Sequence, residues 1–140
     1  MAHIERELGG QIRLAARSFP AVVLTGPRRS GKTYLLRHVF RTASYHLLED
    51  PDVIARIRSD PRGWIEEVRT PTILDEIQHV PEILPYVRTL IDQAPSRRGR
   101  FLLTGSQDFS LMKGVAESMA GRAAVLQLLP LSCREIGRWD

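Results

Sequence analysis

The chain has 140 residues and a mass of 15.9 kDa, which is enough for one compact domain with a hydrophobic core and too short for two. Hydrophobic residues make up 43% and charged residues 26%, so the composition excludes a disordered chain, and no apolar run is long enough to span a membrane. The single cysteine, Cys133, excludes an internal disulfide, and no apolar signal segment follows Met1. We therefore expect a cytoplasmic protein without a membrane partner.

Short apolar runs alternate with helical patterns along the chain. Strands are expected over 21–24, 45–48, 72–74, 101–104 and 124–128. A helix is expected over about 1–19, and a second one follows the first strand and runs to residue 40. Further helices are expected to begin at residues 51, 61 and 80, and another lies around 112–119. Asp50-Pro51 and Asp60-Pro61 each place a capping carboxylate before a proline suited to the first helical position. The pattern predicts an α/β fold with a parallel five-stranded sheet, and ligands of such sheets bind beyond the carboxyl ends of the strands.

The strongest motif follows the first expected strand. Residues 26–33 read Gly-Pro-Arg-Arg-Ser-Gly-Lys-Thr and match the phosphate-loop (Walker A) pattern G-x-x-x-x-G-K-[ST] between a strand and a helix. Gly26 and Gly31 allow the turn, so that backbone N–H groups can point at phosphate oxygens. Lys32 is expected to neutralise charge at the β- and γ-phosphates, and Thr33 to ligate Mg²⁺.

The rest of this segment is assigned to nucleotide binding as well. The further residues assigned to it are Pro27, Arg28, Arg29 and Ser30, together with Tyr34, which directly follows the segment. For Arg28 and Arg29 the alternative is a solvated side chain without a phosphate contact. Tyr34 and Tyr45 could stack on the base, with core packing as the alternative, so the residues leave the identity of the base open.

Two adjacent carboxylates, Asp75 and Glu76, follow the third expected strand, and Asp75 comes 43 residues after Lys32. An acidic residue at the end of a buried strand beside a phosphate loop can hold Mg²⁺, and the next glutamate can polarise the attacking water, the arrangement of a Walker B motif. The alternative is a solvated turn, where such pairs are common. A kinase does not need a glutamate that activates water, so the pair favours hydrolysis over transfer.

Two further positions are candidates for the catalytic site. Ser106, in Thr104-Gly105-Ser106-Gln107 after the fourth strand, either senses the γ-phosphate or caps the next helix. Arg122 follows Gly121, the expected cap at the end of that helix. It either forms a salt bridge or acts as an arginine finger at the γ-phosphate of a neighbouring subunit, which would require a homo-oligomer.

Charge and isolated residues give weaker indications. The net charge is +4, with eight basic and two acidic residues in 1–41 and five basic and ten acidic residues in 42–96. The basic ends, including Arg97-Arg98-Gly99-Arg100, raise nucleic acid as a partner, but a solvated face is favoured because no aromatic residues accompany them. His79 lacks partners at metal-ligand spacing and is expected at the surface or in packing. Cys133 is expected to be structural.

Together these motifs resemble those of the prokaryotic AAA-like P-loop ATPases of the AAA_14 type, whose ATPase module usually precedes a C-terminal domain of unknown function. The likeness rests on Glu5-Arg6, 26–33, Leu74-Asp75-Glu76-Ile77-Gln78, Pro81-Glu82-Ile83-Leu84, Leu103-Thr104-Gly105-Ser106, Ala120-Gly121-Arg122, and Leu129-Pro130-Leu131-Ser132 with Glu135. The resemblance implies ATP as the nucleotide, Mg²⁺ as the cofactor, and a three-layer α/β/α sandwich with strand order 5-1-4-3-2. It also implies metal ligation by Thr33 and Asp75 and a finger position at Arg122.

We therefore expect residues 1–140 to be an ATPase module preceded by an N-terminal helix over about 1–19, without the C-terminal lid and accessory domain of the family. The predicted function is Mg²⁺-dependent hydrolysis of ATP to ADP and phosphate. The catalytic residues would be Lys32, Glu76, Ser106 and Arg122. Two alternatives stay open: a nucleotide-operated switch with little turnover, and a P-loop protein that binds nucleic acid.

Overall fold

A computed structural model describes residues 2–27 and 31–128. Its strands are β1 (Ala21–Thr25), β2 (Ser44–Leu47), β3 (Thr72–Asp75), β4 (Phe101–Gly105) and β5 (Ala123–Gln127). Its helices are α1 (Ala2–Ser18), α2 (Lys32–Val39), α3 (Pro51–Ser59), α4 (Pro61–Glu67), α5 (Leu84–Gln93) and α6 (Phe109–Met119), with 3₁₀ turns η1 (Ile77–His79) and η2 (Pro81–Ile83). Each strand predicted from the sequence is present, with its ends displaced by at most one residue.

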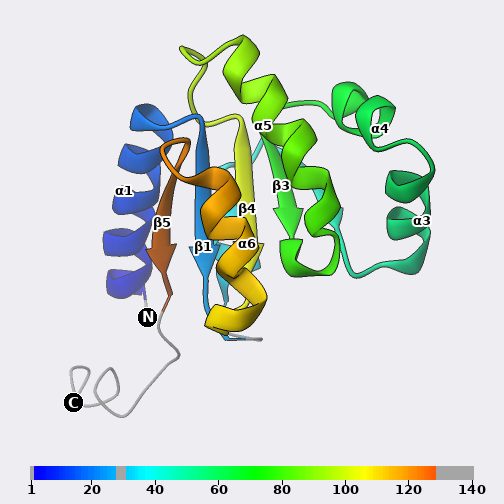
Figure 1. Cartoon of the computed structure of the whole chain (residues 1–140). Coiled ribbons are helices and arrows are strands. Elements are labelled where there is room, and N and C mark those ends of the chain that lie inside the picture. The colour runs from blue at the N-terminus through cyan, green and yellow to red at the C-terminus, as the bar shows by residue number, and fades with distance from the viewer. Residues whose placement is uncertain (1, 28–30, 129–140) are drawn as a thin grey trace.

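The five strands form one parallel sheet with the order β2-β3-β4-β1-β5. The predicted order 5-1-4-3-2 is the same order from the other edge, so it is confirmed. The register pairs Leu24 with Thr104 and Leu74 with Leu103, so the ends of β1, β3 and β4 lie side by side. All arrows point downward in Figure 1, which puts the carboxyl ends of the strands at the lower edge of the sheet.

Helices cover both faces of the sheet, as the predicted three-layer sandwich requires (Figure 1). Alternate residues of β1 pack on opposite faces of the sheet, because successive side chains of a strand point to opposite faces. Val22 and Leu24 pack in one hydrophobic cluster with residues of α1 and α2. Ala21 and Val23 pack in the other cluster with residues of α3, α4, α5 and α6. Both faces are therefore buried, which explains why the strands are nearly uniformly apolar.

The ends of several helices are fixed by the residues predicted to cap them. The Asp50 carboxylate accepts a hydrogen bond from the Asp52 N–H at 2.9 Å, and the Asp60 carboxylate accepts one from the Gly63 N–H at 3.1 Å. Gly121 follows α6 with a φ of 77°, a left-handed conformation that glycine adopts without strain. The capping pattern therefore locates α3 and α4 and the end of α6 correctly.

The helix predicted from Val80 begins later than expected. The segment forms η1 and η2 first, and α5 starts at Leu84. Pro81 and Pro85 both lack the backbone N–H that a continuing α-helix needs, so a regular helix is possible only after η2. Pro85 itself lies in the first turn of α5, where a missing N–H costs nothing.

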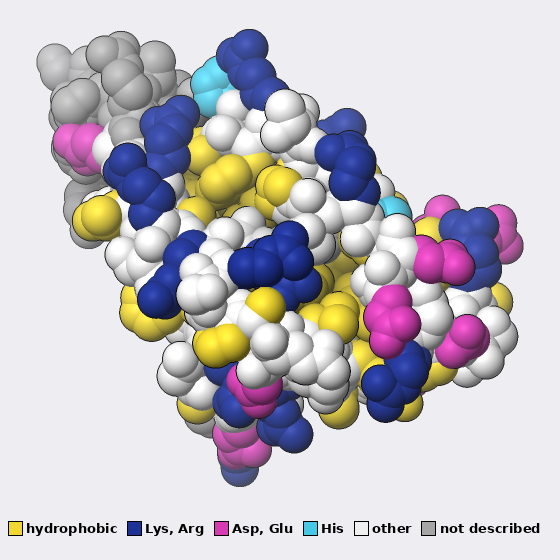
Figure 2. All heavy atoms as spheres, turned by 90° about the horizontal axis from the view of Figure 1, so that it is seen from above, with side chains coloured by type: hydrophobic (Ala, Val, Ile, Leu, Met, Phe, Trp, Pro, Cys, Tyr) yellow, Lys and Arg dark blue, Asp and Glu magenta, His cyan; other side chains and the backbone are white. Residues whose placement is uncertain are grey.

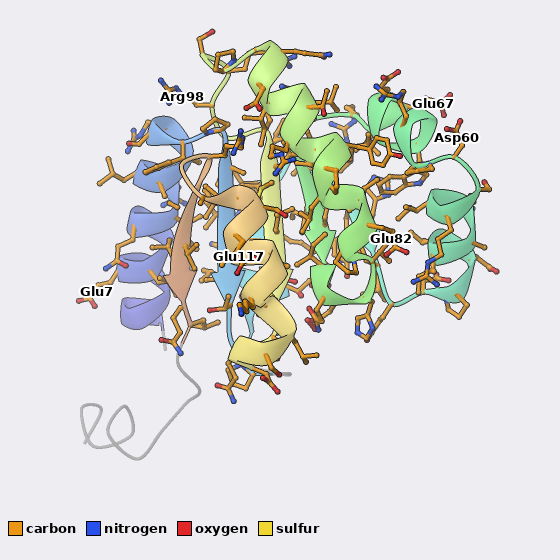
Figure 3. The ribbon with its side chains drawn as sticks, viewed as in Figure 1. Glu7, Asp60, Glu67, Glu82, Arg98 and Glu117 are labelled. Carbon is orange, nitrogen blue, oxygen red and sulfur yellow. The ribbon has the colours of Figure 1, made fainter. Side chains whose placement is uncertain are left out.

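Charge is unevenly distributed over the surface. Figure 2, which looks onto the edge where the strands begin, shows Lys and Arg in groups spread across the view, whereas Asp and Glu gather mainly at its right-hand end. The Arg58 Nε of α3 lies 2.8 Å from the Glu82 Oε2 of η2, and Figure 3 shows Glu82 on the side of α5 that faces α3.

None of the helices in the described ranges is long and apolar enough to cross a membrane.

Candidate functional site

The loop after β1 begins at the lower edge of the sheet. The Gly26 N–H donates to the Gly105 carbonyl at 3.2 Å, which joins the start of the loop to the end of β4. Gly31 precedes α2 with a φ of 91°, and no atom lies near the position of an added Cβ, so glycine is required there for the backbone conformation and not for space. Pro27 is half-buried.

Several sequence assignments fall outside the described residues. These are Arg28, Arg29 and Ser30 of the loop, and Leu129-Pro130-Leu131-Ser132, Cys133 and Glu135 near the C-terminus.

Lys32, the first residue of α2, points into the space between the loop and the sheet. The residue is 4% exposed, and its Nζ donates to the Pro27 carbonyl at 3.2 Å. The same Nζ lies 3.7 Å from the Glu76 Oε1. The ammonium group therefore lies between the phosphate-loop candidate and the carboxylates at the end of β3.

Three hydroxyl groups from three elements converge on the Asp75 carboxylate at the end of β3. The Thr33 Oγ1 of α2 lies 3.0 Å from Oδ1 and 2.9 Å from Oδ2. The Tyr45 hydroxyl of β2 donates to Oδ2 at 2.5 Å, and the Thr104 hydroxyl of β4 donates to Oδ1. Burial, followed by the hydrogen bond to Asp75, raises the pKa of Tyr45 and keeps its hydroxyl a donor. The carboxylate is thereby held in one orientation.

Glu76 is positioned by an unusual backbone. Its φ is 62°, in the left-handed region that residues other than glycine rarely adopt, and its N–H donates to the Thr104 Oγ1 at 2.8 Å. The residue is 7% exposed, and its Oε1 accepts a hydrogen bond from the Gln78 Nε2 at 3.4 Å. The Gln78 Oε1 is buried and has no hydrogen-bond partner in the part of the chain that the structure describes. A strained backbone and buried polar side chains therefore occur together at Glu76 and Gln78.

These side chains surround a hollow of about 250 Å³ at the carboxyl edge of the sheet. Its lining residues come from the start of α2 and from the segments that end β2 and β3: Gly31, Lys32, Thr33, Tyr34, Leu47, Glu49, Asp75 and Glu76. The Thr33 hydroxyl and the Asp75 carboxylate are hard oxygen donors of the type that Mg²⁺ prefers. The hollow combines one buried ammonium group with such donors, which suits a phosphate group accompanied by a divalent cation.

The two tyrosines have different environments. Tyr34 is 62% exposed, so the interpretation that it packs in the core is wrong. It follows Thr33 on the first turn of α2, where the helix surface meets solvent. Tyr45 is half-buried in the cluster under α2, its hydroxyl is bound to Asp75, and the Arg37 guanidinium lies over its ring, 4.6 Å from the centroid. These contacts fit the packing role.

Ser106 does not cap α6, so that interpretation is wrong. The Asp108 carboxylate caps the helix by accepting from the Ser110 N–H at 2.9 Å, and the Ser106 hydroxyl accepts from the Asp108 N–H at 2.9 Å. An aspartate accepts hydrogen bonds more strongly than a serine, and it lies directly before α6. Thr104, and not Ser106, places its hydroxyl against both Asp75 and Glu76. The role of Ser106 in sensing the γ-phosphate stays a prediction.

Arg122 lies at the opposite edge of the sheet from Lys32. It precedes β5, and its carbonyl accepts from the Ala21 N–H at 3.2 Å where β1 begins. Its Nε and Nη2 each lie 2.9 Å from an oxygen of Asp92, and this pairing lowers the pKa of Asp92. The predicted salt bridge is present. Arg122 cannot reach the hollow of its own chain, so a finger role requires a second subunit.

Thr104 offers a direct test of the buried network. Replacing Thr104 with Val keeps the shape and should lower the free energy of unfolding by about 1–3 kcal/mol, because the Glu76 N–H and the Asp75 carboxylate lose a buried partner. Urea denaturation measures the change. In the matched variant Thr89→Val, the lost hydroxyl binds the exposed Pro85 carbonyl at 2.9 Å, and the change should stay within about 0.5 kcal/mol. Equal effects of the two substitutions would contradict the network.

Two solved structures share this fold. The DnaC helicase loader superimposes with a TM-score of 0.57 and 13% sequence identity, over 84% of this chain and 86% of that one. The ORC2 protein of Aeropyrum pernix, solved as ADPNP and ADP complexes, superimposes with a TM-score of 0.57 and 17% identity, over 99% of this chain and 49% of that one. At these identities the similarity shows the P-loop NTPase fold.

Sequence comparison gives the family. Two uncharacterised proteins, Mb2031c of Mycobacterium bovis and Rv2008c of Mycobacterium tuberculosis, are each 33% identical to this chain over 133 residues. The aligned region is 94% of this chain and 30% of each relative, so the chain spans about a third of their length. The AAA_14 family, described as an AAA domain, matches residues 18–137. With the phosphate-loop motif placed at the carboxyl edge of the sheet, the chain belongs to the AAA_14 family of AAA domains.

Proposed function

We propose that this domain binds ATP together with Mg²⁺ and hydrolyses ATP to ADP and phosphate. One observation carries the proposal. At the start of α2, the Lys32 ammonium lies 3.7 Å from the Glu76 carboxylate and the Thr33 hydroxyl lies 2.9 Å from the Asp75 carboxylate. A cation, a metal-ligating hydroxyl and two carboxylates therefore meet in one hollow at the end of the phosphate-loop motif. ORC2 of Aeropyrum pernix, which has a similar fold, binds ADPNP and ADP.

The residues present fit Mg²⁺. Thr33 would ligate the ion directly, and Asp75 would hold it either directly or through its water shell. When bound, Mg²⁺ supplies positive charge to the β- and γ-phosphate oxygens. Tyr45 and Thr104 are positioning residues, because their hydroxyls fix the orientation of the Asp75 carboxylate and do not themselves line the hollow.

Glu76 would serve as the general base. A water molecule attacks the γ-phosphorus in line with the bond to the β–γ bridging oxygen, and Glu76 accepts a proton from that water. The bond to the bridging oxygen breaks, and its electron pair stays on ADP. Lys32 compensates the charge that develops on the phosphate oxygens.

Calorimetric titration of the purified chain with ATP, in the presence and absence of Mg²⁺, tests the binding step, and release of phosphate tests hydrolysis. We expect saturable binding that is tighter with Mg²⁺, followed by phosphate release. Binding without phosphate release would support the nucleotide-operated switch in place of the enzyme. The proposal would be overturned by the absence of any binding.

We further propose that Arg122 acts on the nucleotide of a neighbouring subunit. Replacing Arg122 with Ala should lower turnover by about tenfold and leave ATP affinity unchanged, because the side chain lies far from the hollow of its own chain. Steady-state phosphate release and calorimetry measure the two quantities.

A mixing experiment separates this role of Arg122 from a structural one. Subunits with Arg122→Ala retain Glu76, and subunits with Glu76→Gln retain Arg122, so a mixture of the two impaired variants should turn over faster than the separate variants if the arginine acts across an interface. Mixtures no more active than the separate variants would contradict the role. Asp92→Ala, which removes the partner of Arg122 and leaves the arginine in place, is the control for the lost salt bridge.

A further inference from the structure

The exposed side of α2, together with the turn that follows it, carries two rings and two arginines next to the nucleotide-site candidate. This surface consists of Tyr34, Arg37, His38 and Arg41, which line an open hollow of about 520 Å³ together with Thr33. We propose that it binds single-stranded nucleic acid. The proposal goes beyond ATP hydrolysis and does not depend on it.

The two rings form a platform of the kind on which bases stack. Tyr34 and His38 are one helical turn apart, and their ring planes are inclined by 9° with centroids 6.0 Å apart. Both residues are exposed, and Tyr34 is the most exposed of the large hydrophobic side chains among the described residues, at 62%. A large aromatic side chain that is mostly exposed to solvent is available to a binding partner. Every nucleic-acid base has a π-face that can stack on such a ring.

The arginines give the platform its charge. Arg37 lies on α2 and Arg41 in the turn that follows it, both line the same hollow, and residues 32–41 contain no Asp or Glu. Arg37 is held in place by its position over the Tyr45 ring, 4.6 Å from the centroid, whereas Arg41 is exposed. Cations that alternate with rings along one surface match a strand in which phosphates alternate with bases.

The basic segment Arg97-Arg98-Gly99-Arg100 is less suited to this role. The Arg98 Nη1 donates to the Ser18 carbonyl at 2.7 Å, and the Arg100 Nη1 donates to the Leu90 carbonyl at 2.9 Å. These guanidinium groups therefore tie the loop before β4 to α1 and α5, and Figure 3 shows Arg98 near the upper edge of the sheet, away from the carboxyl ends of the strands. The aromatic residues missing from that segment are present on α2, so α2 is the better candidate.

Fluorescence anisotropy of the purified chain with a labelled oligo-dT of about 20 nucleotides, over a series of NaCl concentrations and without nucleotide, tests the proposal. We expect binding that is tighter than to a duplex of equal length and that weakens as salt rises. Tyr34→Ala and Arg41→Glu should each weaken binding at least about fivefold, and Arg41→Glu should also reduce the salt dependence.

Arg97→Glu is the matched charge reversal on the other basic segment and should change the affinity by less than about twofold. Circular dichroism establishes that each variant is folded. The proposal would be overturned by no binding at about 20 mM NaCl, by equal binding of duplex and single strand, or by a loss in Arg97→Glu as large as that in Arg41→Glu. Calorimetry with MgATP on Arg41→Glu should give the wild-type affinity, which keeps this outcome separate from that of the ATPase proposal.

Discussion

Phosphate release in a single turnover should fall by about 10²–10⁴-fold when Glu76 is replaced with Gln. The substitution keeps the size and hydrogen-bonding capacity of the side chain and removes its basicity, so the attacking water loses its proton acceptor. The Gln78 Nε2 can still donate to the new amide oxygen, and the backbone of residue 76 stays bound to the Thr104 hydroxyl. ATP affinity should therefore be retained or slightly increased, because a negative charge near the γ-phosphate is removed.

The matched control is Glu82→Gln, which makes the same chemical change on η2, outside the hollow. Glu82 is exposed and pairs with Arg58 at 2.8 Å, and this pairing lowers the pKa of Glu82, so the control removes one surface ion pair and leaves the hollow intact. Turnover of this control should match the wild type. Equal phosphate release from Glu76→Gln and the wild type would remove Glu76 from the mechanism.

The fold was predictable because the local signals agree. Strands buried on both faces appear as short apolar runs, and aspartates before prolines mark the beginnings of α3 and α4. The phosphate-loop pattern fixes the end of β1 and the beginning of α2, and the glycine at position 31 has the positive φ that the turn needs. The strand order followed from the family resemblance, not from these local signals.

The contacts inside the site could not be predicted in the same way. Tyr45 and Thr104 reach Asp75 from β2 and β4, and such meetings depend on the register between strands that are distant in sequence. Once the register that pairs Leu74 with Leu103 is known, it puts Thr104 beside Asp75. The sequence alone shows only that each of the two strands ends close to a polar residue. The pairing of Arg122 with Asp92 joins residues 30 positions apart, and no local pattern marks it.

Lys32 should matter for both ligand binding and stability. Replacing it with Met keeps most of the aliphatic stem and removes the ammonium group, which should lower the affinity for MgATP by about 10- to 150-fold, the range for hydrogen bonds to charged groups. Calorimetry measures this loss. Lys113→Met, which changes the other lysine of the chain at an exposed position on α6, is the control and should leave affinity unchanged. Wild-type affinity in Lys32→Met would show that the loop is not the phosphate site.

The second effect of Lys32→Met follows from burial. Glu76 is 7% exposed, and among the described residues the side-chain contact that its carboxylate keeps, once the ammonium group 3.7 Å away is removed, is the hydrogen bond from the Gln78 amide. The free energy of unfolding should therefore fall by about 1–3 kcal/mol in urea denaturation. The double variant Lys32→Met with Glu76→Gln should regain most of this stability while MgATP affinity stays low, because the neutral amide no longer needs a cation but the phosphates still do. A double variant no more stable than Lys32→Met would show that the two side chains are not coupled, and the loss of affinity would then stand as a separate property of the lysine.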